Sequence, residues 1–178
     1  MTAEHYQILR RWFDAHPAAR HSVLLLDRWL PLIPFVCYPV LLCLLNIHLV
    51  QLFLVWKHAA LDYMLLIARA ILVPGFTFWG GTFLRARLNF PRPYEQPGFA
   101  PLVAKESRGH SMPSRHALSA AVLAAVWLYF YPAAGCVMVG IALLICCLRV
   151  LTGVHHVRDV VCGFVLGFAL GCAGMWLL

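Results

Sequence analysis

The sequence predicts an all-α membrane protein, a polytopic helical bundle of five or six spans with its functional site at one membrane face. Of its 178 residues, 62% are hydrophobic and only 12% are charged, whereas soluble domains carry about 25% charged residues. The mean hydropathy is +0.79. Several apolar runs also reach the roughly 20 residues that a transmembrane helix needs. Together these observations favour one integral membrane bundle and leave no room for a second globular domain.

Residues 1–28 are predicted to form an amphipathic N-terminal segment on the membrane surface. Bulky apolar residues such as Trp12 and Phe13 alternate there with arginines, a pattern typical of interfacial helices. The segment has no continuous apolar stretch of the kind found in a signal peptide. Insertion would therefore rely on the first span, and residues 29–178 are expected to form a single domain.

Two long apolar runs come next, Trp29–Trp56 and Leu61–Leu84. Four prolines between residues 31 and 74 blur the helix boundaries in this part of the chain, because proline interrupts helical hydrogen bonding and is tolerated in membrane helices. Residues 22–84 are therefore compatible with either two or three spans.

The C-terminal part predicts a helical hairpin and a last span. Ala117–Leu148 contains no acid, base or histidine and is interrupted at Tyr131–Pro132, which indicates two short spans. In the last span, Val157–Leu178, glycines recur at every fourth residue (Gly163, Gly167, Gly171). Such a stripe lets helices approach closely, and we expect it to pack within the monomer. The sequence does not decide between a monomer and a homodimer.

Arg85–Arg115 is the only long polar connection, and such loops in compact proteins are usually functional. The hairpin that follows it returns the chain to the same membrane side, so the loop should meet the segment Arg149–Asp159. The net charge of +7 does not indicate a nucleic-acid partner, because the cations are not interleaved on a solvated face. We interpret the cations of the polar loop as an anion site.

Ionisable residues in an apolar stretch are costly and indicate function, and the C-terminal part carries Arg149, His155 and Asp159. Guanidinium groups match phosphate oxygens in bidentate fashion. Arg149, with Arg85 and Arg92 from the loop, could stabilise the charge of a phosphoryl-transfer transition state. A carboxylate four residues after a histidine shares its helical face and can fix the imidazole tautomer.

Three motifs stand in order along the chain: Arg85-x6-Arg92-Pro93, Pro113-Ser114-Arg115-His116 and Arg149-x5-His155-x3-Asp159. Together they resemble the type 2 phosphatidic acid phosphatase (PAP2) superfamily, whose signature reads K-x6-RP, PSGH and SR-x5-H-x3-D. The resemblance covers roughly residues 70–170. It implies that His155 is the nucleophile that forms a phosphohistidine, that Asp159 orients it, and that His116 is the general acid. It implies phosphate binding by Arg85, Arg92, Ser114, Arg115 and Arg149, with neither a metal nor another cofactor.

The chain departs from the family signature at three positions. Arg85 stands where the family has lysine, which keeps the charge, and Leu148 replaces a serine. Arg115 replaces the glycine of PSGH, which is the larger change because glycine permits the closest backbone approach. None of these changes removes a catalytic group, so an active enzyme is expected.

The resemblance further implies a small bacterial membrane lipid phosphatase. It would lie in the inner (plasma) membrane and would hydrolyse a lipid phosphate or diphosphate. If the N-terminal arginines lie inside, three spans before Arg85 place the site outside the cytoplasm and two place it inside. The bacterial relatives mostly act on the periplasmic or outer face, which favours a site facing the periplasm or exterior. The compact size and the flank Pro91–Glu95 are most similar to undecaprenyl-diphosphate phosphatases, which favours a polyprenyl diphosphate. Phosphatidylglycerophosphate, phosphatidate and lipid A phosphates are the alternatives.

Other classes of function fit the sequence less well. A non-catalytic lipid-binding or transport protein would also carry intramembrane charges, but here the charges gather at one end of the bundle. The nine histidines invite a metal site, yet no HExxH or paired-carboxylate pattern accompanies them. Vanadate-dependent haloperoxidases and soluble acid phosphatases share the motifs but are not embedded in a membrane. The seven scattered cysteines are expected to be free thiols.

Overall fold

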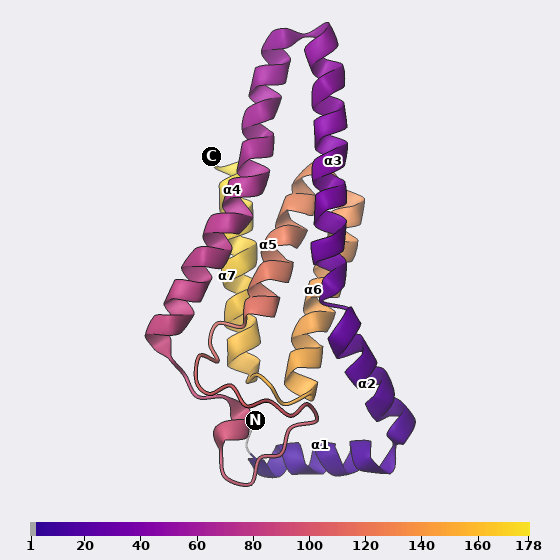
Figure 1. Cartoon of the computed structure of the whole chain (residues 1–178), viewed down its shortest axis with the longest axis vertical. Coiled ribbons are helices and arrows are strands. Elements are labelled where there is room, and N and C mark those ends of the chain that lie inside the picture. Colours follow the sequence, from indigo (N-terminus) through magenta and orange to yellow (C-terminus); the bar gives the residue numbers. More distant parts are fainter. Residues whose placement is uncertain (1–2) are drawn as a thin grey trace.

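The computed structural model describes residues 3–178, and all regular elements within them are helices (Figure 1). In chain order these are α1 (Ala3–Ala15), α2 (Pro17–Trp29), α3 (Leu32–Val55), α4 (Lys57–Leu88), the short 3-10 helix η1 (Pro93–Glu95), α5 (Arg115–Phe130), α6 (Pro132–Leu151) and α7 (Val157–Trp176). The predicted all-α membrane class is confirmed. The break between α5 and α6 falls at Tyr131, as predicted.

Four stretches in the described part of the chain are long and apolar enough to cross a membrane: α2 with α3, then α4, α6 and α7. The fifth apolar helix, α5, is shorter, with 16 residues. Two crossings, α3 and α4, precede the polar loop, which answers the question that the prolines left open. Because α4 continues to Leu88, Arg85 lies in its last turn and not in the loop.

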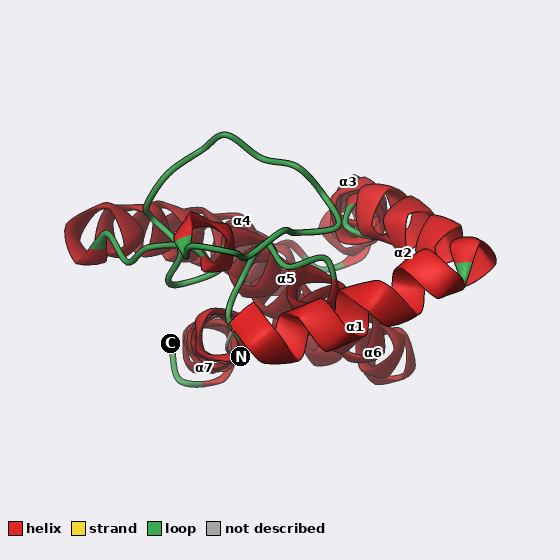
Figure 2. Ribbon diagram, turned by 90° about the horizontal axis from the view of Figure 1, so that it is seen from below, coloured by secondary structure: helices red, strands yellow, loops and turns green. Residues whose placement is uncertain are grey.

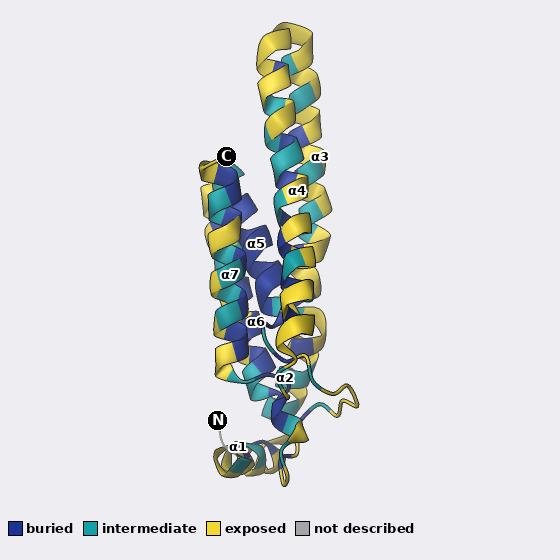
Figure 3. Ribbon diagram, turned by 90° about the vertical axis from the view of Figure 1, so that its left-hand side faces the viewer, coloured by how far each residue is buried: buried dark blue, intermediate teal, exposed yellow. Residues whose placement is uncertain are grey.

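Helix α5 forms the centre of the bundle. Every residue from Ala117 to Trp127 is buried, and Figure 3 shows α5 as a dark core beside the mixed surfaces of α4 and α7. Its most extensive contacts are with α7 and α6. A helix that is apolar on all sides is stable only when it is enclosed, which accounts for the lack of ionisable residues beyond its first turn.

The predicted glycine stripe of α7 packs against α5 within the chain. A Cβ atom placed on Gly167 would lie 2.3 Å from the carbonyl oxygen of Leu118, and one on Gly163 would lie 2.6 Å from that of Ser114. The backbones of the two helices therefore approach more closely than any other residue type would allow. This contact fixes the start of α5 against the start of α7.

Helix α1 lies across one end of the bundle, beside the loop that joins α4 to α5 (Figure 1 and Figure 2). Tyr6 is buried, and its hydroxyl donates a hydrogen bond to the carbonyl of Leu151 (3.0 Å) and accepts one from the amide of Leu102 (3.2 Å). Its ring stacks on Phe99 with a centroid separation of 4.3 Å. The predicted amphipathic segment thus ties the polar loop to the end of α6.

Candidate active site

The first turn of α7 holds a buried carboxylate against a histidine. The Asp159 side chain is completely buried, and its Oδ2 accepts hydrogen bonds from the His156 amide (2.9 Å) and the Ser111 hydroxyl. It also lies 3.7 Å from Nδ1 of His155, and Ser111 Oγ lies 3.4 Å from the same nitrogen. Asp159 and Ser111 therefore both contact the Nδ1 side of the imidazole, which leaves Nε2 as the nitrogen that can react.

The sequence predicted that His155 and Asp159 share one face of a helix. They do not, because α7 begins only at Val157, after His155. The turn between α6 and α7 brings the two side chains together instead. This turn passes through Gly153 at a φ of +75°, a conformation that favours glycine. The amide of His155 then donates to the carbonyl of Arg149 (3.2 Å). The end of α6 and the start of α7 are thereby joined at the histidine.

Helix α5 begins beside this histidine. Ser114 precedes its first turn, and the Ser114 amide donates to the carbonyl of Asp159 (2.9 Å). The buried Ser114 hydroxyl has no hydrogen-bond partner among residues 3–178, so it is free to bind a ligand oxygen. His116 is half-buried in the first turn, within electrostatic range of Arg149, Lys105 and His155.

Two buried arginines approach from the loop side. Arg85 Nη1 donates to the carbonyl of Pro113 (3.2 Å), and Arg92 Nε donates to the carbonyl of Gly109 (3.0 Å). The carboxylate of Glu95 accepts from the amides of both Arg92 (2.8 Å) and Gly109 (2.7 Å), which holds the two limbs of the loop together. Both guanidinium groups lie within electrostatic range of His155.

Arg115, by contrast, is exposed at the start of α5. It lines a cavity of about 280 Å³ together with Arg85 and Arg92. The side chain that replaces the family's glycine therefore adds a cation at the mouth of the site.

Arg149 stands in the last turn of α6 and is 5% exposed. Its Nε lies 3.4 Å from Oδ1 of Asp27, and its Nη2 donates to the Asp27 carbonyl (3.2 Å). Asp27 lies on α2 and is itself buried. The guanidinium that the sequence assigns to phosphate is thus held by a carboxylate from the N-terminal segment.

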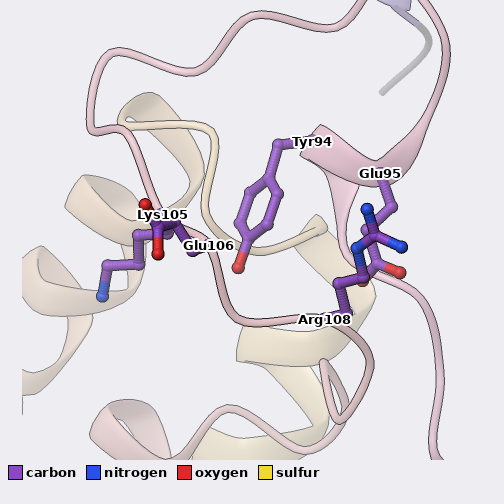
Figure 4. A pocket seen from close by; sticks show the side chains of 5 residues that line it. All are labelled: Tyr94, Glu95, Lys105, Glu106 and Arg108. Carbon is purple, nitrogen blue, oxygen red and sulfur yellow. The ribbon is translucent and has the colours of Figure 1, made fainter.

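A larger cavity of about 510 Å³ opens in the loop beside these groups. It is lined by Tyr94, Glu95, Lys105, Glu106 and Arg108, and Figure 4 shows the Tyr94 ring between Lys105 and Glu106 on one side and Glu95 and Arg108 on the other. Partial burial and the charges of Arg149 and Arg92 lower the pKa of Lys105 from its ordinary value. Lys105 therefore lies near the cations of the site, at the rim of a polar cavity.

A sequence model of the PAP2 superfamily matches residues 59–178. The chain belongs to the PAP2 superfamily. No curated protein matches it at the level of sequence. Among solved structures, LpxE from Aquifex aeolicus has a TM-score of 0.63 at 21% identity, with 94% of this chain and 92% of that chain covered.

A second similar structure is the first transmembrane PAP2-type phosphatidylglycerolphosphate phosphatase from Bacillus subtilis. It has a TM-score of 0.51 at 26% identity, with 96% of this chain and 90% of that chain covered. Both structures span nearly the whole chain, so the similarity extends to the N-terminal helices, which the PAP2 sequence model does not reach.

Three residues near the PAP2 motifs were missed by sequence reasoning: Ser111, Asp27 and Lys105. Ser111 precedes the second motif by two residues and is indistinguishable there from an ordinary loop serine. Asp27 carried a signal that could have been used, because it is an acid directly after the apolar run Leu24–Leu26. Lys105 has no local signal, since its position depends on the path of the loop.

Replacing Ser111 with alanine should lower kcat/KM for a phosphate ester by roughly ten- to hundredfold. The hydroxyl donates to the buried Asp159 carboxylate, and a hydrogen bond to a charged group contributes about 1.5–3 kcal/mol. Ser119→Ala is the matched control, because that buried hydroxyl has no partner within residues 3–178. Equal activity of the two variants would rule out a role for Ser111 in holding the carboxylate.

The pH dependence of the reaction should follow the neutral form of His155. Burial lowers the pKa of this imidazole from its ordinary value of about 6.5, while the Asp159 carboxylate opposes the shift. A lowered pKa means that protonation requires a lower pH, so kcat/KM should begin to fall only below about pH 6.5. The pH–rate profile, corrected for the separately measured titration of the substrate phosphate, checks this. An acidic limb centred above that value would contradict it.

Proposed function

We propose that this protein is a membrane lipid phosphatase that works through a phosphohistidine. The observation that carries the proposal is the convergence, at one end of the bundle, of the His155–Asp159–Ser111 group with the cations of Arg85 and Arg92. Membership of the PAP2 superfamily supports it. The carboxylate holds one imidazole nitrogen, which leaves the other to attack phosphorus.

In the proposed reaction, His155 Nε2 forms a bond to phosphorus as the bond from phosphorus to the ester oxygen breaks. His116 donates a proton to the leaving oxygen. The same residue then takes a proton from water, which attacks the phosphohistidine and releases inorganic phosphate and free His155. Arg85, Arg92 and Arg149 stabilise the charge on the equatorial oxygens throughout, and the unpaired Ser114 hydroxyl donates a further hydrogen bond.

The lipid is the finer part of the proposal. Polyprenyl diphosphate is the substrate that the sequence favours. The Bacillus protein with a similar fold is named for phosphatidylglycerolphosphate, which supports one of the alternatives. A panel of undecaprenyl diphosphate, phosphatidylglycerophosphate, phosphatidate and lipid A in detergent distinguishes them by phosphate release. With the preferred lipid, a phosphoenzyme that is labile in acid and stable in alkali should form rapidly. If no such phosphoenzyme were found during turnover, the phosphohistidine mechanism would be contradicted.

We propose that the site faces the periplasm or exterior, as the family resemblance implies. Two crossings separate α1 and α2 from Arg85, so the N-terminal arginines lie at the same end as the site (Figure 1). The positive-inside rule applied to the N-terminal arginines would favour the cytoplasm for this end, whereas the loop cations are assigned to phosphate binding and do not add to that signal. Pro97 is exposed in that loop. Labelling of Pro97→Cys by an impermeant thiol reagent in intact cells, above the wild-type background, supports the proposal; labelling only after lysis overturns it.

A further inference from the structure

Asp27 is a buried acid that the PAP2 motifs do not explain. It lies on α2, before residues 59–178 that match the superfamily. It is 7% exposed, and 122 positions separate it from Arg149, whose guanidinium it contacts. Burying a carboxylate costs free energy unless a cation pairs with it. Asp27 can therefore be buried because Arg149 pairs with it.

The pairing has a defined geometry. Asp27 Oδ1 faces Nε of Arg149 at 3.4 Å, and the Asp27 carbonyl accepts from Nη2 at 3.2 Å. Within residues 3–178, neither Oδ1 nor Nε has a hydrogen-bond partner, so the ion pair is the interaction on which both atoms depend. Asp27 thus occupies the Nε–Nη2 edge of the guanidinium group. The donors of Nη1 are not used by Asp27, and they remain for a phosphate.

The negative charge of Asp27 also offsets repulsion among the cations near Arg149. Arg149 and Lys105 both lie within electrostatic range of Asp27, and the same two cations lie within range of His116. Without a bound phosphate these cations repel one another. The other buried carboxylate, Asp159, is engaged by Ser111 and the start of α7, so Asp27 is the acid placed to offset that repulsion at Arg149.

We propose that Asp27 is a positioning residue that holds Arg149 in the orientation that binds the substrate phosphate. The inference rests on the proposed phosphatase function. It means that helix α2, beyond the matched segment, contributes to the active site. Asp27 acts through the arginine and does not touch the reacting atoms.

The test compares Asp27→Asn in two backgrounds. This substitution removes the charge and keeps the volume. In the wild-type background we expect KM to rise, with kcat/KM and the affinity for inhibitory orthovanadate each falling roughly ten- to hundredfold, because misplacing a binding group by about 1 Å can cost that much. In an Arg149→Ala background, adding Asp27→Asn should have no further effect on kcat/KM. Asp27→Glu, which keeps the charge, should restore part of the loss.

Asp14→Asn is the matched control, because Asp14 also pairs with arginines but is exposed on α1, and its kinetics should equal those of wild type. Equal losses in both backgrounds, alongside a lower unfolding temperature, would mean that Asp27 is only structural. Increased activity of Asp27→Asn would mean that it competes with phosphate. Either result overturns the inference. If the wild-type protein released phosphate from none of the lipids, the proposed function would be refuted instead. The effect of Asp27→Asn in the two backgrounds would then be compared by calorimetric measurement of inorganic phosphate binding.

Discussion

Replacing His155 with alanine is expected to abolish phosphate release, with a loss in kcat of roughly 10³-fold or more, as in other enzymes that lose their nucleophile. The imidazole is 4% exposed and is held through Nδ1 by Asp159 and Ser111. His110, which also lies near Arg85, has its Nδ1 3.3 Å from the backbone carbonyl of that arginine and not against a carboxylate. The variant should also form no phosphoenzyme, which separates loss of the nucleophile from slow turnover of an intermediate.

The matched control for this variant is His58→Ala. His58 is exposed in the first turn of α4, and the start of this helix lies at the opposite end from the α4–α5 loop (Figure 1). We expect wild-type kinetics from it. His116→Ala makes a useful contrast, because loss of a general acid should lower kcat by roughly 10²–10⁴-fold while the phosphoenzyme can still form from a substrate with a good leaving group. A His155→Ala protein that keeps full activity would exclude the phosphohistidine mechanism.

The fold could be predicted from the sequence wherever local composition determines it. The runs Trp29–Trp56 and Val157–Leu178 became α3 and α7 almost at their expected limits, because a membrane helix must be continuous and apolar. The start of α6 was equally readable, since proline is tolerated at the first helical turn. The placement of α1 could not be read, because the burial of Tyr6 depends on Leu151, which is 145 positions away.

The candidate site, too, contains some residues that the sequence could predict and others that depend on the fold. Side chains that act on phosphate need particular chemical groups, so residue type and spacing could predict a site at Arg85, Arg92 and His155, and the structure brings these three side chains together. The groups that orient them need only be near them in space. Asp27 and Ser111 reach their partners through the packing of α2 against α6 and the path of the loop. Neither contact leaves a periodic signal in the sequence.

Gly163→Ala is the second variant expected to have a large effect, because it acts on the spacing between α5 and α7. An added Cβ would lie 2.6 Å from the carbonyl oxygen of Ser114 and 3.2 Å from its amide nitrogen. Backbone atoms cannot move aside as a flexible side chain can, so the helices must separate at this point. Overpacking of this kind costs about 1–3 kcal/mol. It should also break the hydrogen bond from the Ser114 amide to the carbonyl of Asp159.

The expected result is a lower unfolding temperature in detergent together with a loss of activity larger than the loss of folded protein explains. The reason is that the start of α5 carries Ser114 and His116, while the start of α7 carries Asp159, so a change in helix spacing moves the proposed catalytic groups relative to one another. Gly140→Ala is the matched control, because a Cβ there meets nothing within 4 Å and alanine has the higher helix propensity. If Gly163→Ala kept wild-type kcat/KM per folded molecule, the spacing of α5 and α7 would not be what aligns His116 with His155.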